Sequence, residues 1–155
     1  MVKRSISILV AIVLCFAFLP GPVHAAEAVT NIHISGLERY YPAGSAASIS
    51  GLAARTSQNS VIPESAFSVA GIEPVSMTWE LGTTYYVTFK IAPNPSDFDF
   101  DDDPDMLTVY VDTPDAGTVL VKRQETYSEE YFEIDPDTNT LTVRWRVFLL
   151  GRRHS

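Results

Sequence analysis

Six aspartates fall within the nine residues from 97 to 105, interrupted by two phenylalanines. The six are Asp97, Asp99, Asp101, Asp102, Asp103 and Asp105. Carboxylates this close repel one another unless a cation or solvent offsets their charge, and Ca²⁺ accepts six to eight oxygen ligands. One interpretation is a calcium site with Asp99, Asp101 and Asp103 as ligands. The pattern favours the alternative, a solvated loop whose Phe98 and Phe100 enter the core edge, because no coordinating glycine or distal glutamate completes a known calcium loop.

A second acidic group has oxygen donors at alternate positions, Asp135, Asp137 and Asn139, like the start of an EF-hand loop. The similarity ends at Thr140, where such a loop needs glycine, and at Arg146, where it needs glutamate. Asp, Asn and Pro each favour turn geometry. The segment is therefore predicted to be a hairpin turn.

Tyrosines supply another kind of candidate site. Several occupy positions that should point outward from strands, where exposed aromatic rings beside carboxylates can stack on sugars or anchor a protein partner. The candidates are Tyr86, Tyr110, Tyr127 and Tyr131. On a sheet such side chains more often form cross-strand pairs that support the fold, so both interpretations stay open.

Two arginines, Arg144 and Arg146, share the outer face of the last expected strand. We expect them to pair with acids of a neighbouring strand, such as Glu129, Glu130 or Glu133. An exposed ion pair of this kind contributes little energy, so the arginines are interpreted as part of the fold.

Groups suited to catalysis are few. After the first 25 residues the chain has only two histidines, His33 in the middle of an expected strand and His154 near the end of the sequence. Neither offers a credible base beside a serine nucleophile. Paired carboxylates cleave glycosides in many enzymes, but a surface rich in acids produces such pairs by chance. We therefore predict a protein without enzymatic activity.

Strands must hold these residues, because apolar and polar residues alternate with period two over most of the chain. The clearest alternation covers residues 75–79, 86–91, 107–111 and 141–147. Weaker segments are 30–35, 46–53, 66–70, 118–122 and 131–134. Gly and Pro turn signals separate them at intervals of about ten residues. The pattern predicts an all-β sandwich of about seven to nine antiparallel strands, with Trp79 and Trp145 buried between its sheets.

The first 25 residues have the three regions of a cleavable secretory signal peptide. A positive start at Lys3 and Arg4 precedes an apolar stretch over residues 6–19 and a small-residue cleavage site. That stretch is shorter than the roughly 20 residues that span a bilayer, which argues against an uncleaved membrane anchor. We expect a signal helix that is removed after Ala25, with Ala28 as the near alternative.

Removal of this segment defines the mature protein. Residues 26–148 are predicted to form one sandwich domain, and residues 149–155 a short basic tail that is disordered. Cys15, the only cysteine, lies in the segment expected to be removed, so no disulfide is expected in the mature chain. No membrane span is expected after the signal peptide is cleaved. Nine basic against 19 acidic residues leave a formal charge of −10. This charge makes nucleic acid a poor partner and favours cations or basic partners.

Three groups of short motifs follow one another along the chain. They are Gly36 and Leu37 with Pro42, Ala43 and Gly44, then Val75, Thr78 and Trp79 with Gly82, Thr83 and Tyr85, and last Leu141, Thr142, Val143, Trp145, Val147 and Phe148. In this order they resemble the immunoglobulin-like modules repeated in secreted and cell-wall proteins of bacteria, particularly of the clostridial type. The resemblance covers most of residues 29–148. It implies an immunoglobulin-like β-sandwich with an extracellular role in binding or spacing, and it brings no catalytic residues.

The expected function follows from these points. We predict a secreted, non-enzymatic interaction or spacer module that acts through its acidic surface and loops on a protein or glycan outside the cytoplasm. No cofactor is expected for this module. One alternative is a carbohydrate-binding module, with or without calcium. The other is a hydrolase with a carboxylate pair.

Overall fold

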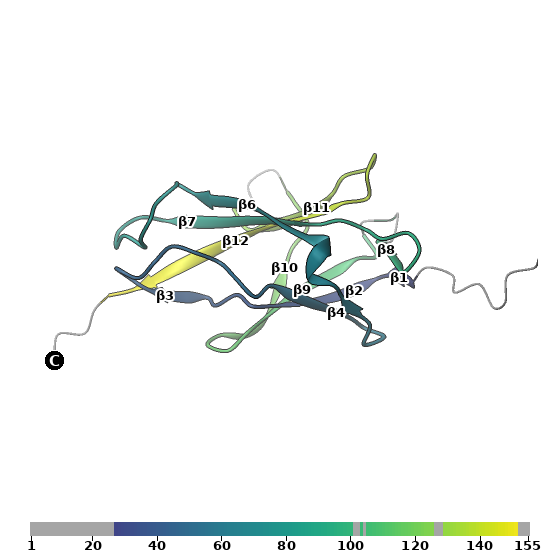
Figure 1. Cartoon of the computed structure of the whole chain (residues 1–155), viewed down its shortest axis with the longest axis horizontal. Helices are drawn as coiled ribbons and strands as arrows, with labels where there is room; N and C mark the ends of the chain where they lie inside the picture. The colour runs from purple at the N-terminus through teal and green to yellow at the C-terminus, as the bar shows by residue number, and fades with distance from the viewer. Residues whose placement is uncertain (1–26, 101–102, 104, 126–128, 152–155) are drawn as a thin grey trace, which may run out of the picture.

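The computed structural model describes residues 27–100, 103, 105–125 and 129–151. Over this range the chain is all β, apart from one 3-10 turn, η1 (Glu64–Ala66). Two sheets face each other as layers, with the long axis of the molecule roughly along the strands (Figure 1). The prediction of an all-β, sandwich-like architecture is confirmed. The predicted signal peptide, residues 1–25, lies outside the described residues.

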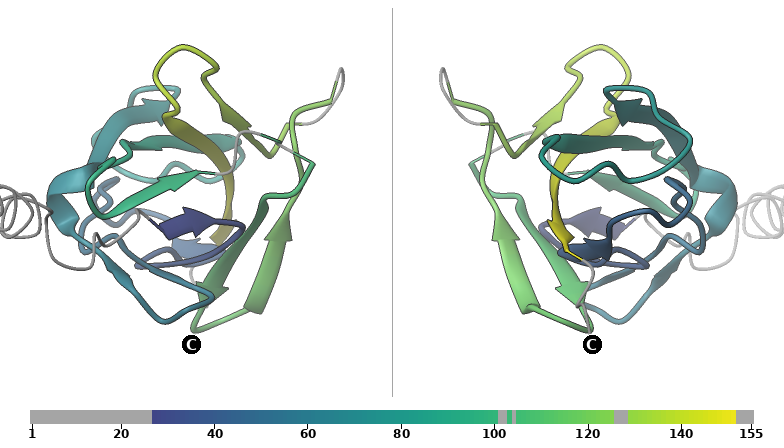
Figure 2. Two further views of the ribbon diagram at one scale, coloured as in Figure 1. Left: turned by 90° about the vertical axis from the view of Figure 1, so that its right-hand side faces the viewer. Right: turned by 90° about the vertical axis from the view of Figure 1, so that its left-hand side faces the viewer.

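One sheet has the strand order β10 (Gly117–Val121), β9 (Thr108–Thr113), β2 (Asn31–Ser35), β4 (Ala53–Thr56), β5 (Val61–Ile62). The other has the order β11 (Tyr131–Ile134), β12 (Leu141–Leu150), β7 (Tyr85–Ile91), β6 (Phe67–Glu73), with β3 (Tyr40–Pro42) beside the end of β12. A separate pair, β1 (Glu27–Val29) and β8 (Phe98–Phe100), lies across one end between the two layers (Figure 2).

Most neighbouring strands are antiparallel, as predicted, but three pairs are parallel. These are β2 with β9, β3 with β12 and β1 with β8. Turn signals report only on segments adjacent in the sequence, so pairings between distant segments leave no local trace. The described residues also contain twelve strands instead of seven to nine, because segments of two or three residues find partners as well.

The core lies between the layers and is built around two indoles. Trp79 and Trp145 are 1% and 0% exposed, as predicted. The alternation read for residues 86–91, 107–111 and 141–147 is confirmed by β7, β9 and β12, whose alternate side chains are buried. Large aromatic side chains bury about 150–250 Å² each, so the two tryptophans make a major contribution to the apolar area removed from water.

One clearly alternating segment, residues 75–79, is a loop and not a strand. Trp79 is buried, but Val75 and Met77 are 95% and 91% exposed. Among the described residues, one isolated bridge and three backbone hydrogen bonds connect residues 77–79 to residues 44–47. These contacts do not form a regular ladder, so the side chains need not alternate between core and solvent, and the prediction of a strand with three inward side chains is wrong.

The weaker segments have mixed outcomes. Strands β2, β6, β10 and β11 match residues 30–35, 66–70, 118–122 and 131–134. The segment 46–53 is not a strand, and β4 begins at its last residue. Strand β12 continues to Leu150, beyond the predicted domain end at 148, because its last residues pair with β3. Residues 152–155 of the predicted tail lie outside the described residues.

Gly36 lies where two backbone segments touch. Its φ is +97°, and a Cβ at this position would lie 2.4 Å from the carbonyl oxygen of Gly51. Gly82 has a similar φ of +89°, but a Cβ there would meet nothing within 4 Å. The two glycines therefore share the backbone strain that a side chain would introduce and differ only in available space.

This difference predicts unequal effects of the same substitution. We expect Gly82→Ala to lower the free energy of unfolding by about 1 kcal/mol, the cost of a left-handed backbone at alanine. Gly36→Ala should cost about 3 kcal/mol or more, because the methyl group also overlaps backbone that cannot move without shifting β4. Urea denaturation of the two variants measures both values. Equal losses would show that the close approach has no energetic weight.

Candidate recognition surfaces

The outer face of the β10–β9–β2–β4–β5 sheet carries a row of side chains that crosses all five strands. The register places Leu120 opposite Tyr110, Tyr110 opposite His33, His33 opposite Arg55, and Arg55 opposite Val61. Leu120 and Val61, at the two ends of the row, are 52% and 62% exposed. We call this row, together with the neighbouring Asp112 and Thr118, the His33 face.

The centre of the His33 face is an ordered polar cluster. The rings of His33 and Tyr110 stack with centroids 4.7 Å apart and an interplanar angle of 16°. Nδ1 of His33 lies 3.2 Å from both carboxylate oxygens of Asp112, and the Thr118 hydroxyl donates a hydrogen bond to the same carboxylate at 2.8 Å. The side chains of His33 and Asp112 are 39% and 43% exposed. A ligand on this face would therefore meet side chains whose positions are already fixed.

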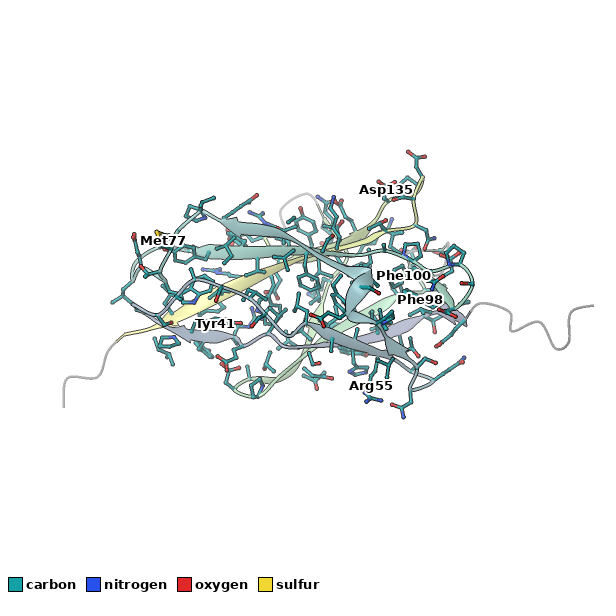
Figure 3. All side chains as sticks on the ribbon, in the orientation of Figure 1. Tyr41, Arg55, Met77, Phe98, Phe100 and Asp135 are labelled. Carbon is teal, nitrogen blue, oxygen red and sulfur yellow. The ribbon has the colours of Figure 1, made fainter. Side chains whose placement is uncertain are left out.

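Arg55 gives this face a positive charge. Its guanidinium group donates a hydrogen bond to Oδ1 of Asn59 at 3.1 Å, and it forms no ion pair with any described residue. Figure 3 shows the side chain pointing away from the sandwich. An exposed arginine without an ion pair in the described part of the chain is notable in a sequence with 19 acidic residues, because it offers a donor fork to an acidic or hydroxyl-rich partner.

The other predicted tyrosines do not join Tyr110. Tyr86 and Tyr131 lie on the outer face of the opposite sheet, beside Arg144. The Arg144 guanidinium lies 4.0 Å from the centre of the Tyr86 ring and 3.5 Å from the carboxylate of Glu73. Tyr127 lies outside the described residues. The four predicted tyrosines therefore do not form one binding site.

Pairs between neighbouring strands explain the arrangement of aromatic and charged side chains on this second face. Burial raises the pKa of the Tyr86 phenol. The hydrogen bond to Glu129 and the negative charge of Glu129 raise this pKa further, whereas the positive charges of Arg146 and Arg144 lower it. Arg146 pairs with Glu129 at 3.2 Å, as predicted. Arg144 instead pairs with Glu73 of β6, which is distant in sequence. Because these charges offset one another, we interpret this face as part of the fold.

The predicted calcium ligands are only partly described. Asp99 lies on β8 and Asp103 in the loop that follows, while Asp101 lies outside the described residues. Oδ1 of Asp103 accepts the backbone N–H of Asp105 at 3.0 Å, and the carboxylate of Asp105 forms an ion pair with Arg123. Among the described residues, no three His, Cys, Asp or Glu side chains are grouped so that they could hold a metal ion. Calcium binding stays a prediction.

The two phenylalanines of the acidic run are buried, as the alternative interpretation predicted. Phe98 and Phe100 are 4% and 2% exposed, and their rings meet edge to face with centroids 5.8 Å apart. Between them, Oδ1 of Asp99 is buried without a hydrogen-bond partner in the described part of the chain. The apolar side chains thus hold the carboxylates of this segment against one end of the sandwich.

The second acidic group forms the predicted hairpin turn. The backbone N–H of Asp135 donates to the carbonyl oxygen of Thr140 at 3.0 Å, and that of Asn139 donates to Asp135 at 2.8 Å. The Asn139 side chain donates to the Phe100 carbonyl and accepts its N–H, at 3.2 and 3.0 Å. The two acidic segments therefore meet at one end, which we call the acidic end. Its described carboxylates belong to Glu27, Asp97, Asp99, Asp103, Asp105, Asp135 and Asp137.

A third cluster ties the beginning of the domain to its last strand. The Arg39 guanidinium lies 3.7 Å from the centre of the Trp145 ring and donates to both oxygens of Glu130, at 2.6 and 3.1 Å. It also donates to the backbone carbonyl of Arg146 at 2.9 Å. The side chains of Arg39 and Glu130 are only 12% and 21% exposed. This pair seals the core over the indole and leaves little of either charge for a ligand.

Asp115 supports this cluster from the β9–β10 turn. Its carboxylate accepts the backbone N–H groups of Arg39 and Tyr40 at 3.0 and 2.9 Å. Desolvation alone would raise the pKa of Asp115, but these hydrogen bonds, with those from its own N–H and from Thr113, hold the pKa below its ordinary value of 3.8.

These features define an all-β, two-layer protein with an ordered polar row on one sheet and an acidic end. Comparison with known protein families, with curated proteins and with solved structures finds no match to this chain. In the described part of the chain, no helix is long and apolar enough to cross a membrane.

The Asp115 contacts predict a pH-dependent contribution to stability. Because the folded pKa is lowered, the stabilisation is complete above pH 3.8 and is lost as the pH falls through the folded pKa. We expect Asp115→Asn to lower the free energy of unfolding by about 1 kcal/mol at neutral pH, and the difference from the wild type to disappear in strong acid. Asp137→Asn, which removes an equal charge from an exposed turn, is the control. A loss for Asp115→Asn that does not change with pH would contradict the assignment.

Proposed function

We propose that this protein is a secreted, non-enzymatic module with an immunoglobulin-like sandwich, which binds an extracellular partner through the His33 face. The observation that carries the proposal is the row from Leu120 to Val61. It combines apolar side chains at its ends with an ordered His-Tyr pair and with Arg55, which is hydrogen-bonded to Asn59 and has no ion pair among the described residues. Aromatic and arginine side chains contribute most of the binding energy in many protein interfaces.

The engagement of the titratable groups supports a role without catalysis. His33, the only histidine among the described residues, is stacked on Tyr110 and faces Asp112. Glu130 is occupied by Arg39, and Glu129 by Arg146. Glu129 and Glu130 are thus held in ion pairs. In the described part of the chain the His33 ring has hydrogen bonds only to Asp112, so it has no hydroxyl nucleophile beside it to activate.

Two further observations support the immunoglobulin-like and extracellular parts of the proposal. The first and last motif groups of the sequence come together where β3 pairs in parallel with β12. The chain also begins with a segment of signal-peptide character, which favours export.

The partner in the leading proposal is a protein that presents acidic side chains to Arg55 and apolar groups to Leu120 and Val61. A carbohydrate-binding module is the second candidate. Tyr110, Asp112 and Arg55 favour it, because aromatic, carboxylate and guanidinium groups are suited to the C–H faces and hydroxyl groups of sugars.

A pair of charge-matched variants tests the proposal. Arg55→Ser should weaken binding to extracellular proteins of the producing cell about tenfold, the loss of one good polar contact. Lys90→Ser removes the same charge from the outer face of β7, the opposite sheet, and should leave binding within about twofold. Biolayer interferometry against fractionated envelope proteins measures both.

The outcome also separates the two partner classes. Oligosaccharide binding on a glycan array that is sensitive to Arg55→Ser would replace the protein partner with a sugar. Loss of that binding on addition of a chelator would point to calcium at the acidic end. Equal binding by both variants would remove the His33 face from the function.

A further inference from the structure

Strand β6 is an open edge of its sheet. It pairs with β7 on one side, and in the described part of the chain no strand lies on its other side. Exposed strand edges are usually protected by charged side chains, by proline or by bulges. Residues 67–72 contain neither a charge nor a proline, and their one protective feature is a bulge at Ala70. The edge therefore keeps the capacity to pair with a further strand.

The ladder to β7 shows which backbone groups face the open side. Just before β6, the Ala92 N–H donates to the Ala66 carbonyl at 2.9 Å. Hydrogen-bonded pairs alternate along an antiparallel ladder, so the N–H and C=O groups of Ser68 face β7 and those of Val69 face the open side. On that side, no described residue forms a backbone hydrogen bond with Val69.

The bulge at Ala70 preserves a second open position. After the bulge the register resumes with Gly71 opposite Thr88 and Ile72 opposite Val87. Alternate residues of β7 face β6, so Thr88 bonds to Gly71, and the N–H and C=O groups of Ile72 face the open side. Gly71 has a φ of +142°, and a Cβ there would meet nothing within 4 Å. Glycine inside a strand often marks a place where another backbone approaches closely.

A recess borders this edge on the outer face of the sheet. It has a volume of about 500 Å³, and its lining includes Gly71, Ile72, Val75 and Thr88. Thr88 lies between the buried residues of β7 and therefore points outward. An apolar side chain of an added strand would find both space and apolar contacts here.

A second recess borders the edge on the core side. It has a volume of about 320 Å³, and its lining includes Ile49, Leu52, Glu64 and Phe67. The Phe67 ring packs against the buried Phe89 ring with centroids 6.4 Å apart, which places this recess on the inner side of the sheet. Successive side chains of a strand point to opposite faces. A strand added to β6 would therefore direct alternate side chains into the two recesses.

Charge at the two ends of β6 distinguishes between the possible occupants. Glu64 lies just before the strand and forms no ion pair with a described residue. Glu73 ends the strand, and its side chain is 68% exposed beside Arg144. If a second copy paired its β6 antiparallel to this one, each Glu73 would lie toward the Glu64 of the other copy, and opposed like charges are destabilising. The excess of acidic over basic residues in the sequence also opposes self-association.

We propose that β6 binds an extended segment of another protein, which joins the sheet as an added strand. Its alternate apolar side chains would enter the two recesses, and a basic side chain would lie beside Glu64. Backbone hydrogen bonds to Val69 and Ile72 provide affinity in this mode of recognition, and the recesses provide specificity. The site belongs to the sheet opposite the His33 face and does not depend on that surface.

Binding of a synthetic peptide tests the proposal. The probe is fluorescein-labelled Lys-Val-Thr-Val-Thr-Val-Lys, and its anisotropy is measured as the full chain is added. Val69→Pro removes an N–H that faces the open side and leaves the ladder bonds to β7 in place, so it should weaken binding at least about tenfold. Arg55→Ser should bind the peptide like the wild type, which separates this site from the His33 face.

A proline at another open edge is the matched control. The Thr56 N–H donates to the Ser60 carbonyl at 2.9 Å, so the same alternation places the N–H of Val61 on the open side of β5. Val61→Pro should leave peptide binding within about twofold of the wild type. Thermal unfolding of both proline variants checks that each one folds.

Amide hydrogen exchange followed by NMR examines the edge in the wild-type protein. In the free protein, the amides of Val69 and Ile72 should exchange at least about tenfold faster than those of Ser68 and Gly71, which bond to β7. The bound peptide should slow exchange at Val69 and Ile72 and leave Val61 unchanged. The proposal would be overturned by absence of peptide binding, by equal losses in the two proline variants, or by protection that lies outside β6. A concentration-dependent dimer that Val69→Pro abolishes would also overturn it, because the edge would then be a contact between copies of the chain.

Discussion

Burial of the Trp145 indole is the constraint from which much of the architecture follows. The ring lies in the middle of the longest strand and is 0% exposed, so its N–H needs an internal acceptor, which the Glu38 carbonyl supplies at 3.0 Å. The chain around Glu38 must therefore cross the open side of the ring, and Arg39 then covers it. Glu130 in turn holds Arg39, and the chain continues from there into β3, which pairs with the end of β12.

The same crossing explains how the His33 face forms. A chain that leaves one sheet at Leu37 for β3 and returns for β4 places β2 at the centre of its sheet, with β4 on one side and β9 on the other. His33 is thereby set against Tyr110 and near Asp112, residues more than 70 positions away. The polar row is a product of the topology, and it would not exist in a sheet of consecutive hairpins.

The sequence shows those features that depend on neighbouring residues. Alternation indicates β7, β9 and β12 and the burial of both tryptophans, and turn-forming residues indicate the hairpin at Asp135, because each of these features is determined within a few residues. Val75 and Met77 follow the same pattern without a ladder, so pattern alone misplaced them. The sequence places His33 in the middle of an expected strand, but it does not show that His33, its partners and Arg55 form one surface, because the parallel register of β2 and β9 leaves no sign in either segment. Asp112 and Thr118 carry no motif of their own.

The His33 face and the acidic end are separate surfaces of the molecule. The row from Leu120 to Val61 crosses the outer face of one sheet, whereas the two acidic segments meet at the turn where the Asn139 side chain bonds to the Phe100 backbone. A partner on the His33 face would therefore leave the acidic end in contact with solvent, where counter-ions screen the repulsion between its carboxylates. Recognition would then use the sheet, and the acidic end would contribute to solubility.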